Sequence, residues 1–146
     1  MNLTLLATAA FGLESIVKME VEELGYRNAA IDNGRVVFRA DEEGIARANL
    51  WLRCSDRVLV RVGTFPAATF DELFEGCRSL PWDLWITRDG RFPVSGRSVK
   101  SRLHSVPDCQ AIVKKAIVES LKLRYGLQTF PETGPVFRVE VSLLQD

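Results

Sequence analysis

The chain has 146 residues, of which 47% are hydrophobic and 26% charged, a composition typical of a folded globular protein and not of a disordered one. No apolar run approaches the roughly 18 residues that cross a bilayer, so we expect no membrane contact and a cytoplasmic location. Cations and acids balance at 19 each, yet residues 85–125 carry nine cations against three acids, and residues 1–84 carry nine against thirteen. This distribution predicts a basic patch on an otherwise acidic body.

The first elements are a strand and a helix. The alternation in NLTLLAT (residues 2–8) indicates a strand, and no positive charge precedes it as a signal peptide would require. Apolar residues then recur at helical spacing from about residue 13 to residue 24, and Gly25 is a typical residue just past a helix end. The expected inward positions are Leu13, Ile16, Val17, Val21 and Leu24.

A hairpin, a second helix and a further strand follow. Asn33-Gly34 is a strong two-residue hairpin signal, and Asp41 is a suitable N-cap for a helix with Ile45, Ala48, Asn49 and Leu52 on one face. In DRVLVRVG (residues 56–63), valines alternate with Arg57 and Arg61. The order β-α-β-β-α-β predicts a ferredoxin-like domain over residues 1–64, with a four-stranded antiparallel sheet and two helices on one face.

Residues 65–146 predict a second, α/β domain, which makes the whole chain α+β. Thr69 can cap a helix whose inward residues are Phe70, Leu73, Phe74 and Cys77. We expect Trp82 and Trp85 to pack in a core or between domains, the alternatives being a base-stacking platform or a protein contact surface. RFPVS (residues 91–95) indicates a strand. After Ser105 and Pro107, a helix over residues 108–124 buries Cys109, Ile112, Val113, Ala116, Ile117, Ser120 and Leu121. VFRVEVSLL (residues 136–144) alternates as a final strand.

The stretch over residues 91–123 holds most of the basic charge. Four basic or titratable residues, Arg97, Lys100, Arg102 and His104, fall within eight positions and are interleaved with Ser98, Ser101 and Ser105. Cations and hydroxyls of this kind suit phosphate oxygens, and the N-terminus of the following helix adds exposed N–H groups. The pattern favours contact with nucleic acid, while a solvated loop with scattered charges is the alternative.

The residue types present give little support for a catalytic function. His104 is the only histidine, and the three cysteines, Cys54, Cys77 and Cys109, lie far apart without a CxxC pair. We therefore expect neither a zinc site nor a disulfide framework. The chain also lacks a Walker loop and a GxGxxG element after a strand, so no bound cofactor is expected. A small enzyme centred on His104 is the weakest alternative.

Four longer stretches carry a family resemblance. FGLESIVKMEVEELGY, NGRVVFRAD and ANLWLRCSDRVLVRVGTFPAATFDELFE resemble the opening of bacterial 23S rRNA guanine-N2 methyltransferases, and the strand–GRSVKSRLHS–helix stretch resembles the core of a THUMP domain. The resemblance implies a ferredoxin-like piece followed by an RNA-binding THUMP module over residues 65–146, which we expect to lack its last strands. It also implies a class I catalytic domain that uses S-adenosylmethionine. The glycine-rich loop and the Asn/Asp-Pro-Pro-aromatic motif of that domain do not occur here.

The resemblance implies RNA, rRNA before tRNA and not DNA, as the partner. It assigns RNA contact to Arg97, Lys100, Ser101, Arg102, His104, Lys114 and Lys115, and it assigns methyl transfer only to a longer parent protein. A protein-interaction or dimerisation module that uses the ferredoxin-like sheet and the two tryptophans is the alternative function.

Overall fold

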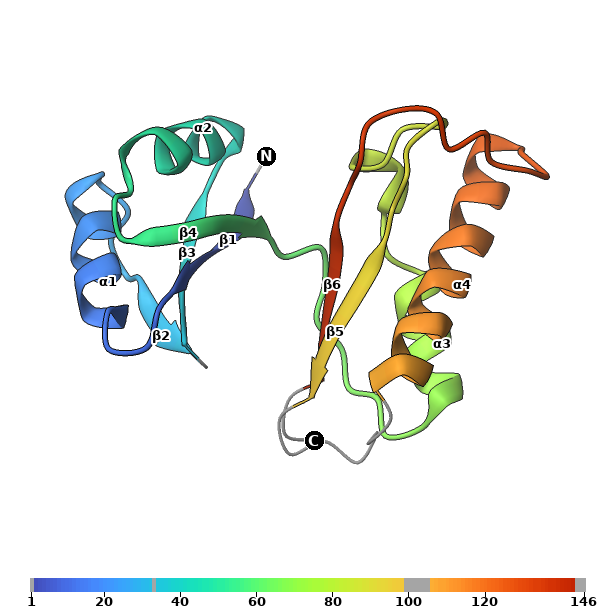
Figure 1. Ribbon diagram of the computed structural model, residues 1–146, viewed down its shortest axis with the longest axis horizontal. Helices are drawn as coiled ribbons and strands as arrows, with labels where there is room; N and C mark the ends of the chain where they lie inside the picture. The colour runs from blue at the N-terminus through green and yellow to red at the C-terminus, as the bar shows by residue number, and fades with distance from the viewer. Residues whose placement is uncertain (1, 33, 99–105, 144–146) are drawn as a thin grey trace. The chain divides into compact units, whose positions relative to one another are not determined.

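The computed structural model describes residues 2–32, 34–98 and 106–143 (Figure 1). The chain forms two compact units, Met1–Arg61 and Val62–Asp146. Both units contain helices and strands, and the predicted α+β class is confirmed.

The first unit is a four-stranded antiparallel sheet with two helices. Its strands stand in the order β2-β3-β1-β4, and each neighbouring pair is antiparallel. This arrangement is the ferredoxin-like topology that the sequence predicted. The elements are β1 (Leu3–Ala9), α1 (Glu14–Glu23), β2 (Ala30–Asp32), β3 (Arg35–Ala40), α2 (Glu42–Trp51) and β4 (Ser55–Val60).

Local signals define the ends of these elements as predicted. Gly25 has a φ of +101°, a conformation that glycine adopts without strain, and it follows the end of α1. Gly34 has a φ of +78°, and Asp32 pairs with Arg35 on either side of the predicted hairpin turn, of which Asn33 lies outside the described residues. Asp41 caps α2, because its Oδ1 accepts a hydrogen bond of 3.1 Å from the backbone N–H of Gly44.

Burial alternates along β1, which shows which face of the sheet the helices cover. The side chains of Leu3, Leu5 and Ala7 are buried, and those between them are only partly buried. On the helices, Val17 and Val21 of α1 and Ala48 of α2 are fully buried, as predicted. Both helices therefore pack on the same face and leave the other face of the sheet without a helix.

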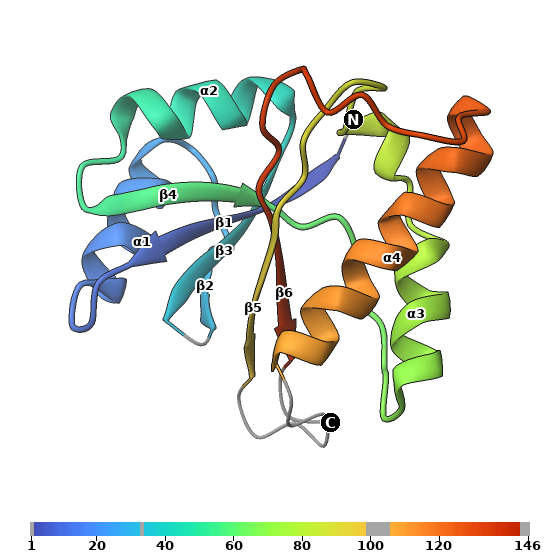
Figure 2. The same ribbon diagram turned by 45° about the vertical axis from the view of Figure 1, so that its right-hand side comes forward.

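The second unit packs two helices beside a two-stranded parallel sheet. Figure 2 shows α3 and α4 side by side, with β5 next to β6. Its elements are α3 (Phe70–Arg78), the short 3-10 helix η1 (Trp82–Leu84), β5 (Val94–Ser98), α4 (Val106–Tyr125) and β6 (Val139–Leu143). The core comprises Leu73, Cys77, Trp82, Ile86, Phe92, Cys109, Val113, Ala116, Ile117, Leu121 and Leu143.

The apolar stripe of α4 dominates this core. Six of the seven residues predicted for it are buried, and Ile112 packs against the cluster while partly buried. Trp82 is also a core residue, because its ring is 5% exposed and its Nε1 donates a 2.7 Å hydrogen bond to the carbonyl of Cys77. Its predicted place in a core is confirmed, and a surface role for this ring is wrong.

Three residues predicted to face inward are exposed. Phe70 begins α3 and is 42% exposed, and Ile16 of α1 is 44% exposed. Asn49 of α2 is exposed and donates its side-chain amide to the carbonyl of Ile45. Helical spacing gives the angular position of a residue, but it does not show whether a neighbouring element covers that end of the helix.

Ser120 is a buried hydroxyl that has no hydrogen-bond partner among the described residues. We expect Ser120→Ala to raise the free energy of unfolding by about 1 kcal/mol, because it removes an unsatisfied polar group and improves helix propensity. Chemical denaturation measures this change. Ser79→Ala is the matched control and should instead lower stability slightly, because the Ser79 hydroxyl donates to the carbonyl of Glu75. A loss of 1 kcal/mol or more in Ser120→Ala would contradict the expectation.

Candidate nucleic-acid interface

The candidate interface is built on β5 and the beginning of α4. Gln110 of α4 donates its Nε2 to the carbonyl of Val94 at 2.8 Å, which ties the helix to the strand. Gly96 permits this close packing, because a Cβ there would lie 3.1 Å from side-chain atoms of Val106 and of Val141. The strand and the helix are therefore held side by side at the two ends of residues 99–105, which we call the connector.

The predicted connector residues fall largely outside the described part of the chain. Lys100, Ser101, Arg102 and His104 all lie within residues 99–105, which the structure does not describe. Arg97 is described: it is partly buried on β5 and stands opposite Ser142 in the parallel pairing with β6. Arg97 directly precedes the connector in the sequence, and its contact with RNA stays a prediction.

Lys114 makes several contacts within the second unit. Its Nζ donates a 3.1 Å hydrogen bond to the carbonyl of Phe92 and lies 3.6 Å from the centroid of the Phe92 ring. The same Nζ is 3.7 Å from a carboxylate oxygen of Glu132, whose φ of +50° is unusual for a residue other than glycine. Lys114 therefore joins α4 to the start of the β5 segment and to the loop before β6.

Lys115 lies on a different side of α4. Its side chain is exposed, and its ammonium group is 6.0 Å from the centroid of the Phe74 ring on α3. Adjacent residues on a helix point about 100° apart, so the two lysines do not form one cation pair. The structure brings Lys114 next to Phe92 and Lys115 next to α3.

Two cations that the sequence analysis did not predict, Arg91 and Arg138, lie near the predicted Lys114. Together these three residues line a depression of about 370 Å³ in the second unit. Its other lining residues are Phe92, Pro93, Glu132 and Val136. The parallel pairing of residues 91–98 with residues 136–143 brings Arg138 to the same depression as Arg91. The only sequence signal was the alternation of Arg138 within the last strand.

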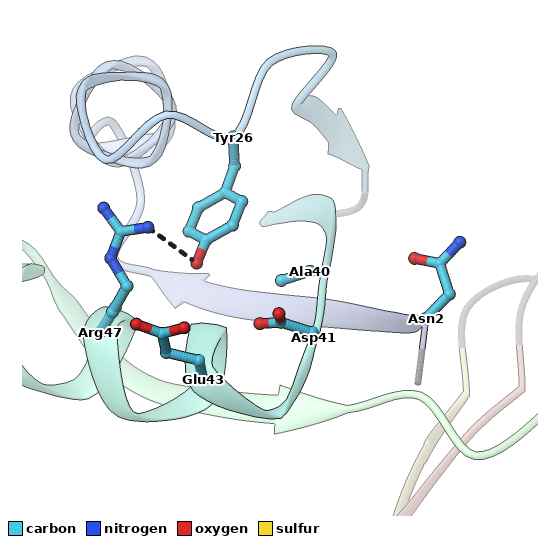
Figure 3. Close-up of a pocket in the computed structure, with 6 residues that line it drawn as sticks. All are labelled: Asn2, Tyr26, Ala40, Asp41, Glu43 and Arg47. Carbon is cyan, nitrogen blue, oxygen red and sulfur yellow. Dashed lines mark hydrogen bonds between the residues drawn. The ribbon is translucent and has the colours of Figure 1, made fainter.

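A hollow in the first unit has a structural explanation (Figure 3). It measures about 420 Å³ and is lined by Asn2, Tyr26, Ala40, Asp41, Glu43 and Arg47. Arg47 donates to the carbonyl of Leu24 at 2.7 Å and to the hydroxyl of Tyr26 at 3.4 Å (the latter drawn in Figure 3). Because Asp41 caps α2 and Arg47 binds groups of the neighbouring segment, the contacts of these two residues support the fold.

The cysteines are poor nucleophiles. Burial raises the pKa of Cys77 to about 12. Desolvation likewise raises the pKa of Cys54, with help from Glu20, and that of Cys109, with help from Asp108. Neutral thiols react weakly, so none of the three is suited to covalent catalysis.

The described residues contain no group of three or more side chains suited to hold a metal ion. Within that part of the chain, no helix has the length and apolar character needed to traverse a bilayer.

The chain matches two family models in succession. Residues 67–146 match the model described as THUMP domain. Residues 4–59 match the model described as RlmL ferredoxin-like domain. The two matches correspond to the two compact units and to the two parts of the predicted resemblance.

Several known proteins are similar over the whole chain. The chain is 54% identical to "Putative RNA methyltransferase YpsC" of Bacillus subtilis, over 98% of this chain and 37% of that protein. It is also 54% identical, with a TM-score of 0.94, to a Listeria monocytogenes structure described as a "predicted N6-adenine-specific DNA methylase", over 100% of this chain and 38% of that one. A second structure, SMU.472, described as "a putative methyltransferase complexed with SAH", has 44% identity and a TM-score of 0.91, over 99% of this chain and 39% of that one. The chain thus spans less than two fifths of these relatives.

The contacts of Lys114 lead to a stability prediction. We expect Lys114→Ala to lower the free energy of unfolding by about 1–2 kcal/mol, because it removes a charged hydrogen bond, a cation–π contact and a partly exposed ion pair. The matched control, Lys115→Ala, should change stability by less than about 0.5 kcal/mol. Urea unfolding of both variants measures the difference. Equal losses in the two variants would refute the structural role of Lys114.

Proposed function

This chain belongs to the THUMP domain family, and from that premise we propose that it is the RNA-binding, substrate-recognition part of an RNA methyltransferase. The observation that carries the proposal is the match of residues 67–146 to the THUMP domain, a span that contains the basic connector. The similarity to a Bacillus subtilis protein described as an RNA methyltransferase supports the same assignment.

The proposed contacts are mainly to the RNA backbone. Arg97 on β5, the connector cations Lys100 and Arg102 and the beginning of α4 supply guanidinium, ammonium and N–H donors for phosphate oxygens. Proteins that meet RNA helices read backbone shape more than base edges, because the deep groove of A-form RNA excludes side chains. Ser101 and His104 add a hydroxyl and an imidazole, and we assign Lys115 an auxiliary contact. Lys114 makes three contacts inside the fold, so we assign it a smaller part in RNA binding.

Titration of an RNA hairpin with this chain, followed by fluorescence anisotropy, tests the proposal. The binding constant should fall steeply with salt, because four to six phosphate contacts release counterions. The triple variant Arg97→Ala/Lys100→Ala/Arg102→Ala should reduce the slope of log K against log salt by about 2, since each lost contact removes roughly 0.7–0.9. Affinity should fall by about tenfold or more at low salt.

The control removes the same charge elsewhere. Lys18, Arg27 and Arg53 lie in the first unit, and their triple change to glutamine should leave the slope intact. Absence of binding by the wild-type chain at low salt would refute the proposal. A tight dimer in sedimentation that is indifferent to RNA would instead favour the protein-interaction alternative.

The finer assignment concerns the chemistry of a longer protein. We propose that, in a protein of its relatives' length, this chain presents 23S rRNA to a domain that methylates guanine N2 with S-adenosylmethionine, in the cytoplasm. Two observations support it: residues 4–59 match the RlmL ferredoxin-like model, and a relative of similar sequence is described with bound SAH. The Listeria relative, described as an adenine-specific DNA methylase, suggests a different base and polymer, so the choice requires an experiment.

Nucleoside mass spectrometry distinguishes these reactions. A full-length protein containing this chain, incubated with S-adenosylmethionine and unmodified 23S rRNA, should produce N2-methylguanosine. Omission of S-adenosylmethionine should abolish the product. Parallel reactions with tRNA and duplex DNA serve as controls. N2-methylguanosine formed only in tRNA would refute the rRNA assignment, and N6-methyladenine in DNA would refute the RNA assignment altogether.

A further inference from the structure

The face of the first unit's sheet that the helices leave uncovered carries four arginines. Strand register identifies its residues, because directly paired residues of antiparallel strands share a face. Leu6 of β1 pairs with Val37 of β3 and with Leu59 of β4, so these three form a central apolar row. They alternate with the buried residues Leu5 and Ala7, which face the helices.

The arginines flank this row at both ends. Arg39 pairs with Thr4, and the backbone N–H of Arg61 donates to the carbonyl of Thr4 at 2.9 Å. At the other end Arg35 pairs with Thr8, and the backbone N–H of Arg57 donates to the Thr8 hydroxyl oxygen at 3.0 Å. Arg39, Arg57 and Arg61 are exposed, and Arg35 is partly buried.

Arginines outnumber acids on the open face of this unit. Its acids among the described residues are Asp32, which pairs across the hairpin with Arg35, and Asp56, which is next to Arg57. Asp56 and Arg57 both stand opposite Thr8, because β4 has one extra residue between the pairs Ala7–Val58 and Ala9–Ser55. No acidic residue of the described strands stands opposite Arg39 or Arg61 in the register. The remaining acids of residues 1–61 lie on the helices or at the helix start at Asp41.

The spacing of the arginines suits an extended polyanion. Thr4 and Thr8 are four residues apart, so the two arginine pairs stand ~13 Å apart along the strands, and β3 and β4 flank β1 at ~10 Å from each other. Guanidinium groups bind phosphate through two parallel hydrogen bonds, and the four cations of this face are all arginines. A ligand with repeated phosphates can engage several of them together.

The central row determines what kind of contact is available. Leu6, Val37 and Leu59 are aliphatic, and no aromatic ring belongs to the described open face. Sheets that bind unpaired bases stack them on aromatic side chains, which this face lacks. The chemistry therefore favours the sugar–phosphate backbone over the bases.

We propose that the open face of the ferredoxin-like sheet, through Arg39, Arg57 and Arg61 with Arg35, is a second RNA contact surface that grips the phosphate backbone without reading sequence. It rests on the proposed function only in taking RNA as the ligand. The surface is distinct from the connector and belongs to a unit for which neither the sequence pattern nor the matched family description assigns RNA contact.

The test changes Arg39, Arg57 and Arg61 to glutamine in the present chain and titrates the RNA hairpin at several salt concentrations. The slope of log K against log salt should fall by about 2, and affinity at low salt should fall by about tenfold. The control Lys18→Gln/Arg27→Gln/Arg53→Gln removes the same charge from the same unit and should leave the slope unchanged. Arg39→Lys/Arg57→Lys/Arg61→Lys keeps the charge and should preserve the slope.

The outcomes separate this inference from the proposed function. A slope that falls with the connector variant but not with the arginine-face variant would overturn the second surface alone. Failure of the wild-type chain to bind RNA would overturn both. If the glutamine variant reduced the salt slope for duplex DNA but not for RNA, RNA would be overturned as the ligand of this face. If Arg39→Lys/Arg57→Lys/Arg61→Lys reduced the salt slope as much as the glutamine variant does, with thermal unfolding unchanged, the charge-based account would be overturned.

Discussion

A strand covered by helices on one face must bury every second residue, and this constraint organises the first unit. In β1 it buries Leu3, Leu5 and Ala7 and leaves Thr4, Leu6 and Thr8 on the other side. A register shift of one residue would exchange the two sets and expose the apolar residues. The same pleat that builds the core therefore also determines which arginines share a solvent-facing surface.

The second unit depends on the buried stripe of α4 in a comparable way. Because Cys109, Val113, Ile117 and Leu121 face the core, the cations of this helix can lie only on its flanks. Lys114 lies on the flank near Phe92 and Glu132, and Lys115 on the flank near α3. Burial of the stripe thus separates two lysines that are adjacent in sequence.

Most of the fold followed from local sequence signals. Gly25, Gly34 and Asp41 act through backbone conformation or a short-range hydrogen bond, so their roles could be predicted without knowledge of the neighbouring elements. Pairings between segments that are far apart in the sequence could not be predicted in this way. The pairing of β5 with β6 joins segments some 45 residues apart and brings Arg138 to the depression that Arg91 lines. Likewise, alternation predicted that Arg57 and Arg61 share a side, but only the strand order places Arg35 and Arg39 on the same face.

The net charge of the chain is zero, but its cations fall into two groups. Arg47, Lys114 and Arg124 each have a named partner inside their own unit, respectively the carbonyl of Leu24, that of Phe92 and the carboxylate of Asp83. These three stabilise the fold, and a polyanion would have to compete with existing contacts for them. Arg39, Arg57 and Arg61 instead lie exposed on a strand face, and of these three only Arg57 is next to an acid of that face, Asp56. Since phosphate binding gains most from cations that break no existing contact, these are the described side chains from which a backbone-reading RNA surface is best built.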